Sequence, residues 1–380
     1  MLMNHSRAQR LMAEQGLDAL FLRNALNVTY ASDFHNAGAS LATRPFAAVV
    51  FRDAAVEPFL VVPSVDFRLA KHMSWIQDVR AYIRAEKASD RDREFYPDFF
   101  AAVRAGFQDR KATGLRLGYE DTFLPAPFFD QLRAALPGCT WVPASDLIGR
   151  IRAVKTPEEI VNLKRAAEIT VKAHESFRQA ITVGATERDL ALAAQFTMLR
   201  EGAEKVGFIY VGSNATRGFA HHPFPTEVPL KRGDFVKVDM GCVYRGYESD
   251  FVRSYVLGKA TDRQQEVYRA LDEGSLAIGM YLKPGRSCID VYNWGFTFMN
   301  ERLPGYAREF LGHGIGLGPH EEPRLHEGNA MVLEPGMVIC IEHSFYLDGA
   351  RYHFEDTFVI EESGPVCWTA ALGRSLEVAV

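Results

Sequence analysis

The amino-acid sequence predicts an α/β (α+β) fold, because helical and strand patterns alternate along most of the chain. Residues 5–16 have a helical pattern, residues 19–22 are strand-like, and the runs 45–51 and 58–62 predict a hairpin around Asp53. The alternation continues to about residue 148, and beyond residue 156 a pair of helices precedes a strand hairpin twice. The length of 380 residues fits two domains or one large domain.

The helices of the second part are predicted from their start signals. Thr156 followed by Pro157 is typical of a helix N-terminus, because the hydroxyl caps the first turn and proline fits its first position. Three further helices are predicted at 187–202, opened by Thr186, at 262–283, and after Ser287. The polar stretch 86–94 is expected to be a solvated helix or loop without a function.

Two neighbouring strand-like runs carry the first pair of acidic residues, Asp239 and Asp250. If Tyr244 and Arg245 form a two-residue loop between these runs, pairing outward from the loop brings Asp239 directly opposite Asp250. The two carboxylates then share one face of a hairpin. A slip of one residue would move the pairing to the other face, so the prediction depends on the register.

A second hairpin repeats this arrangement with a sharper turn signal. Asp348-Gly349 separates two β-branched and aromatic runs, and type I′ turns favour this dipeptide because both central residues need a positive φ. Counting outward from this turn brings Glu342 opposite Glu355. Carboxylates facing each other in pairs would repel and destabilise the sheet, and divalent cations remove that repulsion.

An imidazole lies between the two hairpins in sequence. His313 stands in the glycine-rich segment 310–323, where the backbone can pass close to a buried centre, and a neutral imidazole suits a metal ion. Four carboxylates and one imidazole form a hard ligand set typical of a hydrolytic pair of divalent ions. The sequence therefore predicts a metal centre formed by five ligands, Asp239, Asp250, His313, Glu342 and Glu355.

Three more histidines are candidates for the rim of this centre. His320 follows His313 by seven residues and is expected to contact the substrate or an intermediate rather than an ion. The step His221-His222 stands in a proline-bounded loop just before the first metal hairpin. The sequence does not decide which of these two side chains faces the site, and His222 is favoured.

Strand alternation sorts the remaining polar residues of the hairpins. Arg253 is expected on the face opposite Asp250, where it pairs with an acid behind the site. Tyr346 and Arg351 share the ligand face near the hairpin tip. They are candidates for substrate contacts, although an ordinary surface role is an equal alternative.

Taken together, these segments resemble the pita-bread metallopeptidases, a family that includes Xaa-Pro aminopeptidase, prolidase, methionine aminopeptidase and the metal-free creatinase. The resemblance rests on the ligand order Asp, Asp, His, Glu, Glu and on four segments: 238–241 (VDMG), 249–254 (SDFVRS), 312–317 (GHGIGL) and 354–357 (FEDT). The stretches 152–160 and 7–30 resemble the prolidase and creatinase branch. The implied domains are 1–150, a small creatinase-like domain, and 151–380, a pita-bread domain with a curved, mainly antiparallel sheet flanked by helices.

The resemblance also implies a mechanism. Asp239 would bind one ion, Asp250 and Glu355 would bridge two ions, and His313 and Glu342 would complete the second. Manganese is the expected metal, with cobalt, zinc and iron as alternatives. A water between the ions would be the nucleophile, and Glu342 would take its proton.

His320 and His222 would stabilise the oxyanion and position the scissile carbonyl. The resemblance further implies a homodimer in which one chain's small domain borders the other's site. His35 and Arg44 are candidates at that interface.

Two positions depart from the usual pattern of this family. Glu342 is followed by His343-Ser344, where prolidase-type enzymes have Pro-Gly, and His353 stands where they have arginine. By alternation His353 faces the site and His343 points away. An imidazole in place of a guanidinium changes which anion can be held, so two substrate classes stay open. The first is a peptide with a bond before proline, and the second is another small amide or metabolite. A catalytically silent binding protein on the same scaffold is a minor alternative.

Composition excludes several other classes. A formal net charge of −5 gives no basic surface for nucleic acid, and no apolar run approaches 18 residues, so neither nucleic acid nor a membrane is an expected partner. The first residues lack the apolar core of a signal peptide. Five dispersed cysteines predict buried thiols in a reducing cytoplasm.

Overall fold

The computed structural model describes residues 1–36, 44–83 and 95–379. Contacts within the chain divide it into two compact units, Met1–Arg152 and Ala153–Val380. The polar stretch predicted at 86–94 lies outside the described residues.

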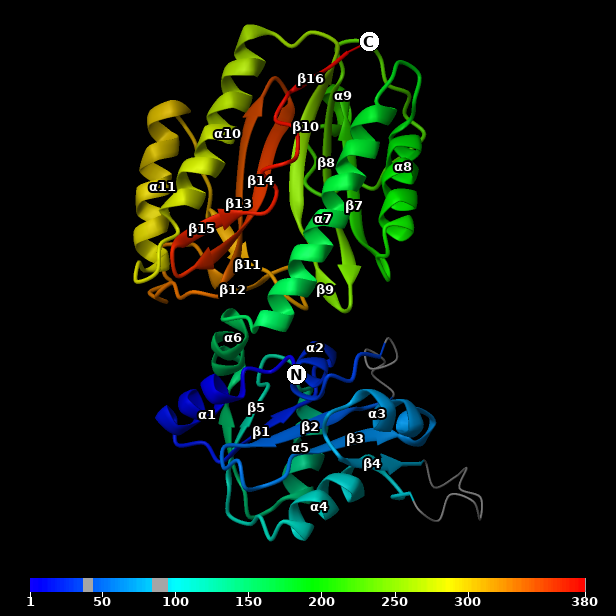
Figure 1. Cartoon of the computed structure of the whole chain (residues 1–380), viewed down its shortest axis with the longest axis vertical. Coiled ribbons are helices and arrows are strands. Elements are labelled where there is room, and N and C mark those ends of the chain that lie inside the picture. Colours follow the sequence, from blue (N-terminus) through cyan, green and yellow to red (C-terminus); the bar gives the residue numbers. More distant parts are fainter. Residues whose placement is uncertain (37–43, 84–94, 380) are drawn as a thin grey trace. The chain divides into compact units, whose positions relative to one another are not determined.

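The first unit is built on a six-stranded mixed sheet, with the strand order β4-β3-β2-β1-β5-β6 (Figure 1). Its strands are β1 (Ala19–Leu22), β2 (Ala47–Phe51), β3 (Phe59–Pro63), β4 (Asp78–Tyr82), β5 (Arg116–Tyr119) and β6 (Thr140–Pro143). Strand β2 runs antiparallel to β1 and β3, so the predicted hairpin around Asp53 is confirmed. The other neighbouring strands of this sheet pair in parallel.

Helices of the first unit precede or connect these strands, as the alternating pattern predicted. They are α1 (His5–Glu14), α2 (Ala25–Ser32), the short 3₁₀ turn η2 (Ser64–Asp66), α3 (Phe67–Met73), α4 (Phe99–Asp109), α5 (Ala126–Ala135) and α6 (Ser145–Ala153). Asn4 caps α1 by accepting from the backbone N–H of Arg7, which explains why the helix begins there.

Four long helices of the second unit begin at the predicted start signals. They are α7 (Pro157–Ala180), α8 (Glu187–Arg200), α10 (Asp262–Tyr281) and α11 (Cys288–Arg302). Thr156 and Glu159 form a capping box at the start of α7, and Thr186 and Asp189 form another at α8. These caps satisfy backbone N–H groups that the helices cannot satisfy themselves.

The strands of the second unit form two five-stranded sheets. The first contains β7 (Lys205–Ser213), β8 (Phe235–Tyr244), β9 (Tyr247–Glu248), β10 (Phe251–Leu257) and β16 (Glu377–Val378). The second contains β11 (Gly312–Gly314), β12 (Glu321–Arg324), β13 (Val338–Leu347), β14 (Ala350–Glu361) and β15 (Gly364–Cys367). All these pairings are antiparallel except that of β10 with β16.

Each sheet of the second unit has its own helix pair and its own apolar core. Buried side chains of α7 and α8 pack with those of the first sheet, and those of α10 and α11 pack with the second (Figure 1). Strand β10 of the first sheet and β14 of the second lie side by side, because Ser254 exchanges hydrogen bonds of 3.0 Å with the backbone of His353. The site of interest lies where these two sheets meet.

The two metal hairpins differ in how well their registers were predicted. Glu342 pairs directly with Glu355, and the turn Asp348-Gly349 has φ values of 50° and 77°, so the second hairpin is confirmed. In the first hairpin the predicted loop is wrong, because Tyr244 pairs with Tyr247 and the loop is Arg245-Gly246, with φ values of 49° and 81°. Glycine tolerates such a φ without steric cost, which favours this loop over the predicted one.

The corrected loop moves the partner of Asp239. Asp239 faces Val252 instead of Asp250, which lies just before β10. The register therefore differs by two residues from the predicted one. Since side chains alternate with a period of two, an even shift leaves both aspartates on the same face of the sheet.

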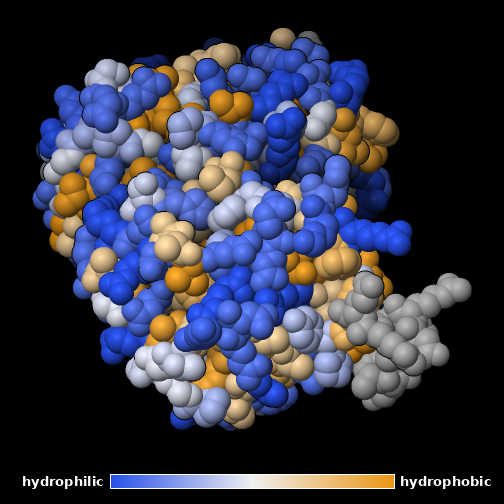
Figure 2. All heavy atoms as spheres, turned by 60° about the horizontal axis from the view of Figure 1, so that its bottom comes forward, coloured by the Kyte–Doolittle hydropathy of each residue, from blue (hydrophilic) through white to orange (hydrophobic). Residues whose placement is uncertain are grey.

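Large apolar side chains on the surface are dispersed. Hydrophobic residues lie singly or in small groups among hydrophilic ones on the face drawn in Figure 2. Within the described part of the chain, no helix is long and apolar enough to span a bilayer.

Candidate metal centre

The five predicted ligands line one cavity of about 380 Å³ in the second unit. Asp239 lies on β8 of the first sheet and Asp250 lies directly before β10 of that sheet, whereas His313, Glu342 and Glu355 come from the second sheet. Each of these residues is at most 6% exposed. The fold therefore brings together residues separated by up to 116 positions in the sequence and buries them at the boundary of two sheets.

His313 is the centre of this group. Its Nε2 atom lies 3.9 Å from Oδ2 of Asp250, 3.8 Å from Oε1 of Glu342 and 3.6 Å from Oε1 of Glu355. Its Nδ1 atom is 3.1 Å from the carbonyl oxygen of Gly314, and a proton on Nδ1 donates to that oxygen. Burial lowers the pKa of His313, so the ring is neutral and Nε2 offers a lone pair toward the carboxylates.

Three of the carboxylates lie close to one another in the cavity. Single oxygens of Asp239, Asp250 and Glu355 lie within 4.8 Å of each other. Burial raises the pKa of Asp239 to about 7, and burial with the neighbouring acids raises the pKa values of Asp250 and Glu355 well above their ordinary range. Oδ1 of Asp239 and Oε1 of Glu355 are buried and accept no hydrogen bond.

Buried oxygens without donors are costly unless a proton or a cation compensates them. Hard divalent ions are the expected occupants, because the five predicted ligands supply carboxylate oxygens and one imidazole nitrogen. His320 and Cys340 also belong to groups of side chains that could hold an ion. The residues present therefore fit a divalent metal centre.

Glu342 differs from the other three acids because it has two strong donors. Its Oε2 atom accepts from Nη2 of Arg308 at 2.6 Å and from Nε2 of His353 at 3.1 Å. Burial alone would raise the pKa of Glu342, but the hydrogen bond from His353 and the charge of Arg308 hold it well below its ordinary value. Glu342 is therefore ionised, with Oε2 fixed and Oε1 directed at His313.

Arg308 is a functional candidate that the sequence did not predict. It lies between α11 and β11, 34 positions before Glu342, and it also donates to Oγ of Ser344 at 3.2 Å. Because His353 occupies the strand position where an arginine was expected, Arg308 supplies a guanidinium from a different segment. No local sequence pattern predicts this contact between Arg308 and Glu342.

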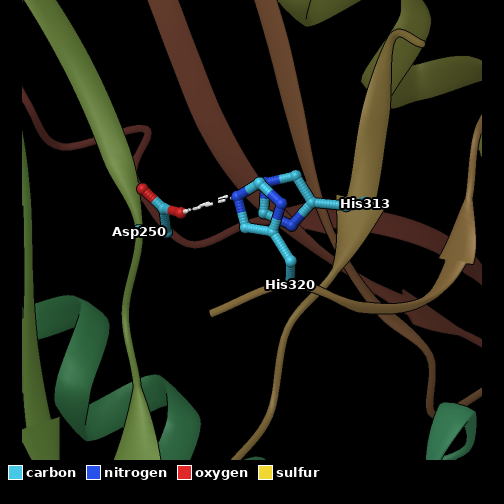
Figure 3. Close-up of side chains that lie close together, drawn as sticks. All are labelled: Asp250, His313 and His320. Carbon is cyan, nitrogen blue, oxygen red and sulfur yellow. Dashed lines mark ion pairs between the residues drawn. The ribbon is translucent and has the colours of Figure 1, made fainter. Parts of the chain in front are cut away.

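His320 lies directly over His313 (Figure 3). The two rings stack with centroids 3.8 Å apart, and Nε2 of His320 is 3.8 Å from Oδ2 of Asp250. Burial and the neighbouring His313 lower the pKa of His320 to about 4, so its imidazole is neutral. A neutral imidazole at the rim of the centre can donate one N–H to an oxygen of a bound substrate.

His221 and His222 both line the cavity, so the choice that the sequence left open does not exclude either residue. Their rings lie 4.1 Å apart, and the ring of His222 lies 4.7 Å from that of Tyr210. Nη1 of Arg351 donates to Nδ1 of His221 at 2.5 Å. Burial, followed by the charge of Arg351, lowers the pKa of His221 to about 4.

The two histidines that depart from the family pattern lie on opposite faces of β13 and β14. His353 lines the cavity, whereas His343 is buried on the other side, where Nδ1 lies 2.8 Å from the hydroxyl of Tyr306. Both placements agree with the prediction from alternation.

The hairpin tip and the rear face also follow from alternation. Tyr346 pairs with Arg351 at the tip of the hairpin, and Tyr346 is 61% exposed. Neither residue is among those that line the cavity, so contact with a small substrate there is not supported for Tyr346. Arg253 is buried on the opposite face and pairs with Asp356 at 2.6 Å, as predicted.

Five cavity residues were not predicted: Phe208, Tyr210, Phe310, Pro319 and Arg324. Arg324 pairs directly with His313 across β11 and β12, which places a cation next to the metal centre. Phe310 and Arg324 also line a second cavity of about 770 Å³. The contribution of Arg324 depends on a short strand, β12, that the sequence did not reveal.

Comparison with known proteins identifies the class. The family model of metallopeptidase family M24 matches residues 161–362, and the model of the creatinase/prolidase N-terminal domain matches residues 5–154. The chain therefore belongs to metallopeptidase family M24 and is a peptidase-type hydrolase. The family and the fold predicted from the sequence are both confirmed.

Similar proteins cover nearly the whole chain. An Xaa-Pro dipeptidase of Pyrococcus horikoshii is 30% identical over 358 residues, which is 93% of each chain. An Xaa-Pro dipeptidase of Lactobacillus helveticus is 29% identical over 373 residues, 95% of each chain. Among solved structures, the prolidase from Pyrococcus horikoshii has a TM-score of 0.80 at 28% identity and covers 98% of this chain and 99% of its own. The X-Pro aminopeptidase from Thermotoga maritima has a TM-score of 0.82 at 25% identity, with 99% of each chain covered.

Proposed function

We propose that this protein is a metal-dependent peptidase that hydrolyses the bond before proline in small peptides. The observation that carries the proposal is the buried set of four carboxylates and one imidazole at a cavity of about 380 Å³. Relatives that match nearly the whole chain are Xaa-Pro dipeptidases, which supports a proline substrate.

Two divalent ions are the proposed cofactors, with manganese expected and cobalt, zinc or iron as alternatives. Asp239, Asp250, His313, Glu342 and Glu355 would hold them. When bound, the ions supply Lewis acidity that polarises a carbonyl and lowers the pKa of a shared water toward neutrality.

The residues of the chain divide the remaining chemistry among them. Glu342 is ionised and its Oε1 is directed into the centre, so this oxygen accepts the proton of the attacking water and later returns it to the leaving nitrogen. His320 and His222 present neutral imidazoles to the cavity, and their N–H groups stabilise the negative oxygen that develops on the scissile carbonyl. His221 and His353 contact the substrate, and Arg351 acts by holding His221.

Arg324 is proposed to hold the free carboxylate of a dipeptide. Arg324 pairs with His313 across β11 and β12 and lines the cavity. Guanidinium groups bind carboxylates through two parallel hydrogen bonds. The larger cavity beyond Phe310 leaves room for a longer chain, so dipeptides and longer peptides have to be compared directly.

The deciding experiment is an activity screen of manganese- and cobalt-loaded protein. Its arms are Xaa-Pro dipeptides, longer peptides with proline in the second position, and non-peptide amides, with Glu355→Gln as the control that loses a proposed ligand. Activity on a proline substrate that Glu355→Gln lacks is the expected result. Absence of activity on every proline substrate would contradict the proposal.

A second candidate, a hydrolase or lyase of another small amide or metabolite, is favoured by one observation. His353 contacts Glu342 where an arginine was expected, so the charge that faces the substrate differs from that of proline-specific enzymes. Activity confined to the non-peptide arm would select this candidate. A silent binding scaffold requires a metal content well below one ion per chain in protein purified without chelator.

We also propose a homodimeric, cytoplasmic enzyme. All five cysteines are free, which suits a reducing compartment, although Cys139 and Cys367 are only partly buried and the prediction of five buried thiols is wrong for these two. Light scattering would measure the mass of the assembly, and a monomer at micromolar concentration would contradict the dimer.

A further inference from the structure

The two cavity histidines His221 and His222 stand on a segment without regular structure. This segment, residues 213–226, is here called the histidine segment; it begins with Ser213 at the end of β7, continues into the short helix α9 (Asn214–Arg217) and has no regular structure after that helix. Few backbone hydrogen bonds join it to the sheets, among them Val211 N–H to the carbonyl of Pro223 and Arg351 N–H to that of Gly218, each 2.9 Å. Its shape therefore depends on side chains.

One buried carboxylate binds both ends of the histidine segment. Oε1 of Glu187 accepts from the N–H and the hydroxyl of Ser213 at 2.9 and 2.8 Å. Oε2 of Glu187 accepts from the N–H and the hydroxyl of Thr226 at 3.0 and 2.8 Å. Residues thirteen positions apart are thus fixed to the two oxygens of one side chain.

Charge complementarity adds a fifth donor to the same carboxylate. Nε of Arg217, inside the segment, lies 3.2 and 3.1 Å from the two oxygens of Glu187, and Nη2 of Arg217 donates to the carbonyl of Phe224 at 2.6 Å. The side chain of Glu187 has no exposed surface. A buried carboxylate is stable only when its oxygens are satisfied, so this network has one low-energy arrangement.

The middle of the segment is held from the sheet below it. Nζ of Lys237, on β8, donates to the carbonyl oxygens of Ala220 and His221 at 2.6 and 2.8 Å. Lys237 fixes the distance between the sheet and the backbone next to the histidines, while Glu187 fixes the positions of the two end residues of the segment. Glu187 is not among the residues that line the cavity, so it acts only through the segment.

We propose that Glu187 is a positioning residue that holds His221 and His222 at the metal cavity. The role rests on the proposed function, because it matters for catalysis only if these imidazoles contact the substrate. Glu187 opens α8, where its neighbour Asp189 forms the capping box with Thr186. The first turn of α8 therefore holds two acids with separate tasks, one for the helix and one for the histidine segment.

This separation provides a matched pair of variants. Glu187→Gln keeps the shape of the side chain but removes the charge, and its amide nitrogen cannot accept from Ser213 or from Thr226. Asp189→Asn removes the same charge two residues later, weakens the cap of α8 and leaves the contacts of the segment in place. Both proteins are compared with the wild type in the metal-loaded state.

Two readouts separate the positioning role from the proposed function. Because glutamine keeps one acceptor oxygen, amide hydrogen exchange at one of the two residues, Ser213 or Thr226, is expected to be at least ten-fold faster in Glu187→Gln than in the wild type, and exchange at both is expected to be unchanged in Asp189→Asn. On the best substrate of the screen, kcat/KM of Glu187→Gln is expected to fall by about 10- to 100-fold with unchanged metal content. Asp189→Asn should stay within two-fold of the wild type.

Equal exchange rates in Glu187→Gln and the wild type would overturn the proposal. So would an equal loss of kcat/KM in the two variants, because that result assigns the effect to α8. If the wild type cleaves no substrate, the proposed function fails, and the exchange rates alone then decide whether Glu187 holds the segment.

Discussion

Asp239→Asn should make the metal-free protein more stable at pH 8 while it destroys metal binding. Asp239 is 6% exposed, and burial, with the charge of Glu342, raises its pKa from the ordinary 3.8 to about 7. At pH 8 the wild type must keep this buried carboxylate charged when no ion is bound. Asparagine has nearly the same shape and no charge to desolvate.

The size of this stability difference follows from the pKa shift of Asp239. A change from 3.8 to about 7 corresponds to about 4 kcal/mol, at 1.36 kcal/mol for each pKa unit. Because the pKa of the folded state lies above that of the unfolded state, the folded protein binds the proton more tightly. The contribution of Asp239 to the free energy of unfolding is therefore fully present below about pH 4 and is lost as the pH rises through about 7. The advantage of the variant should approach about 4 kcal/mol at pH 8 and shrink toward zero near pH 4.

Urea unfolding in the presence of chelator at pH 4, 5, 6 and 8 measures this difference. Glu175→Gln, which removes an exposed charge on α7, is the control and should change stability by about 0.5 kcal/mol or less. With manganese added, the order should reverse, since only the wild type gains stability from the ion. A metal-free wild type whose stability rises between pH 5 and 8, or equal stability of both proteins at pH 8, would refute the reasoning.

Three further predictions follow from contacts around the centre. Gly241→Ala should unfold at a lower temperature and hold less metal, because a Cβ there would lie 1.8 Å from the carbonyl oxygen of Ser249; Gly373→Ala meets nothing within 4 Å and should match the wild type in both assays. Arg308→Gln should weaken metal binding in chelator competition by roughly 10- to 100-fold, because Glu342 loses a donor at 2.6 Å; unchanged affinity would contradict this role. Arg253→Met should lower the free energy of unfolding in urea by about 1.5–3 kcal/mol, since the buried carboxylate of Asp356 keeps only Arg374 of its two guanidinium partners, and a loss smaller than about 0.5 kcal/mol would count against it.

Local signals in the sequence predicted what local interactions determine. Thr156 and Thr186 open helices because their hydroxyls cap the first turn, and Asp348-Gly349 forms its turn because of the φ values that the turn requires. The loop of the first hairpin was misplaced by one residue because Gly246 was counted outside it. Asp239 and Asp250 still lie on the same face of this hairpin, since the resulting register shift of two preserves alternation.

Contacts between distant segments left no such signal. Arg308 reaches Glu342 from a connection 34 residues away, and Arg324 comes to face His313 only because β12 pairs with β11. Glu187 was predicted as part of a helix start, and its second task is visible only when both ends of the histidine segment are seen around it. The roles of such residues become visible only in the tertiary structure, because spacing and periodicity in the sequence predict local structure and not contacts between distant segments.

The division of the ligands between two sheets has a mechanical consequence. Asp239 lies in the first sheet and Asp250 directly before its strand β10, whereas His313, Glu342 and Glu355 lie in the second sheet. Strands β10 and β14 meet through side-chain hydrogen bonds such as that of Arg253 to the carbonyl of Glu355. Bound ions would cross-link the two sheets at this boundary. The force needed to separate the two sheets should then depend on the metal concentration. Removal of the ions should weaken the boundary between the sheets before it weakens the strand pairing within either sheet.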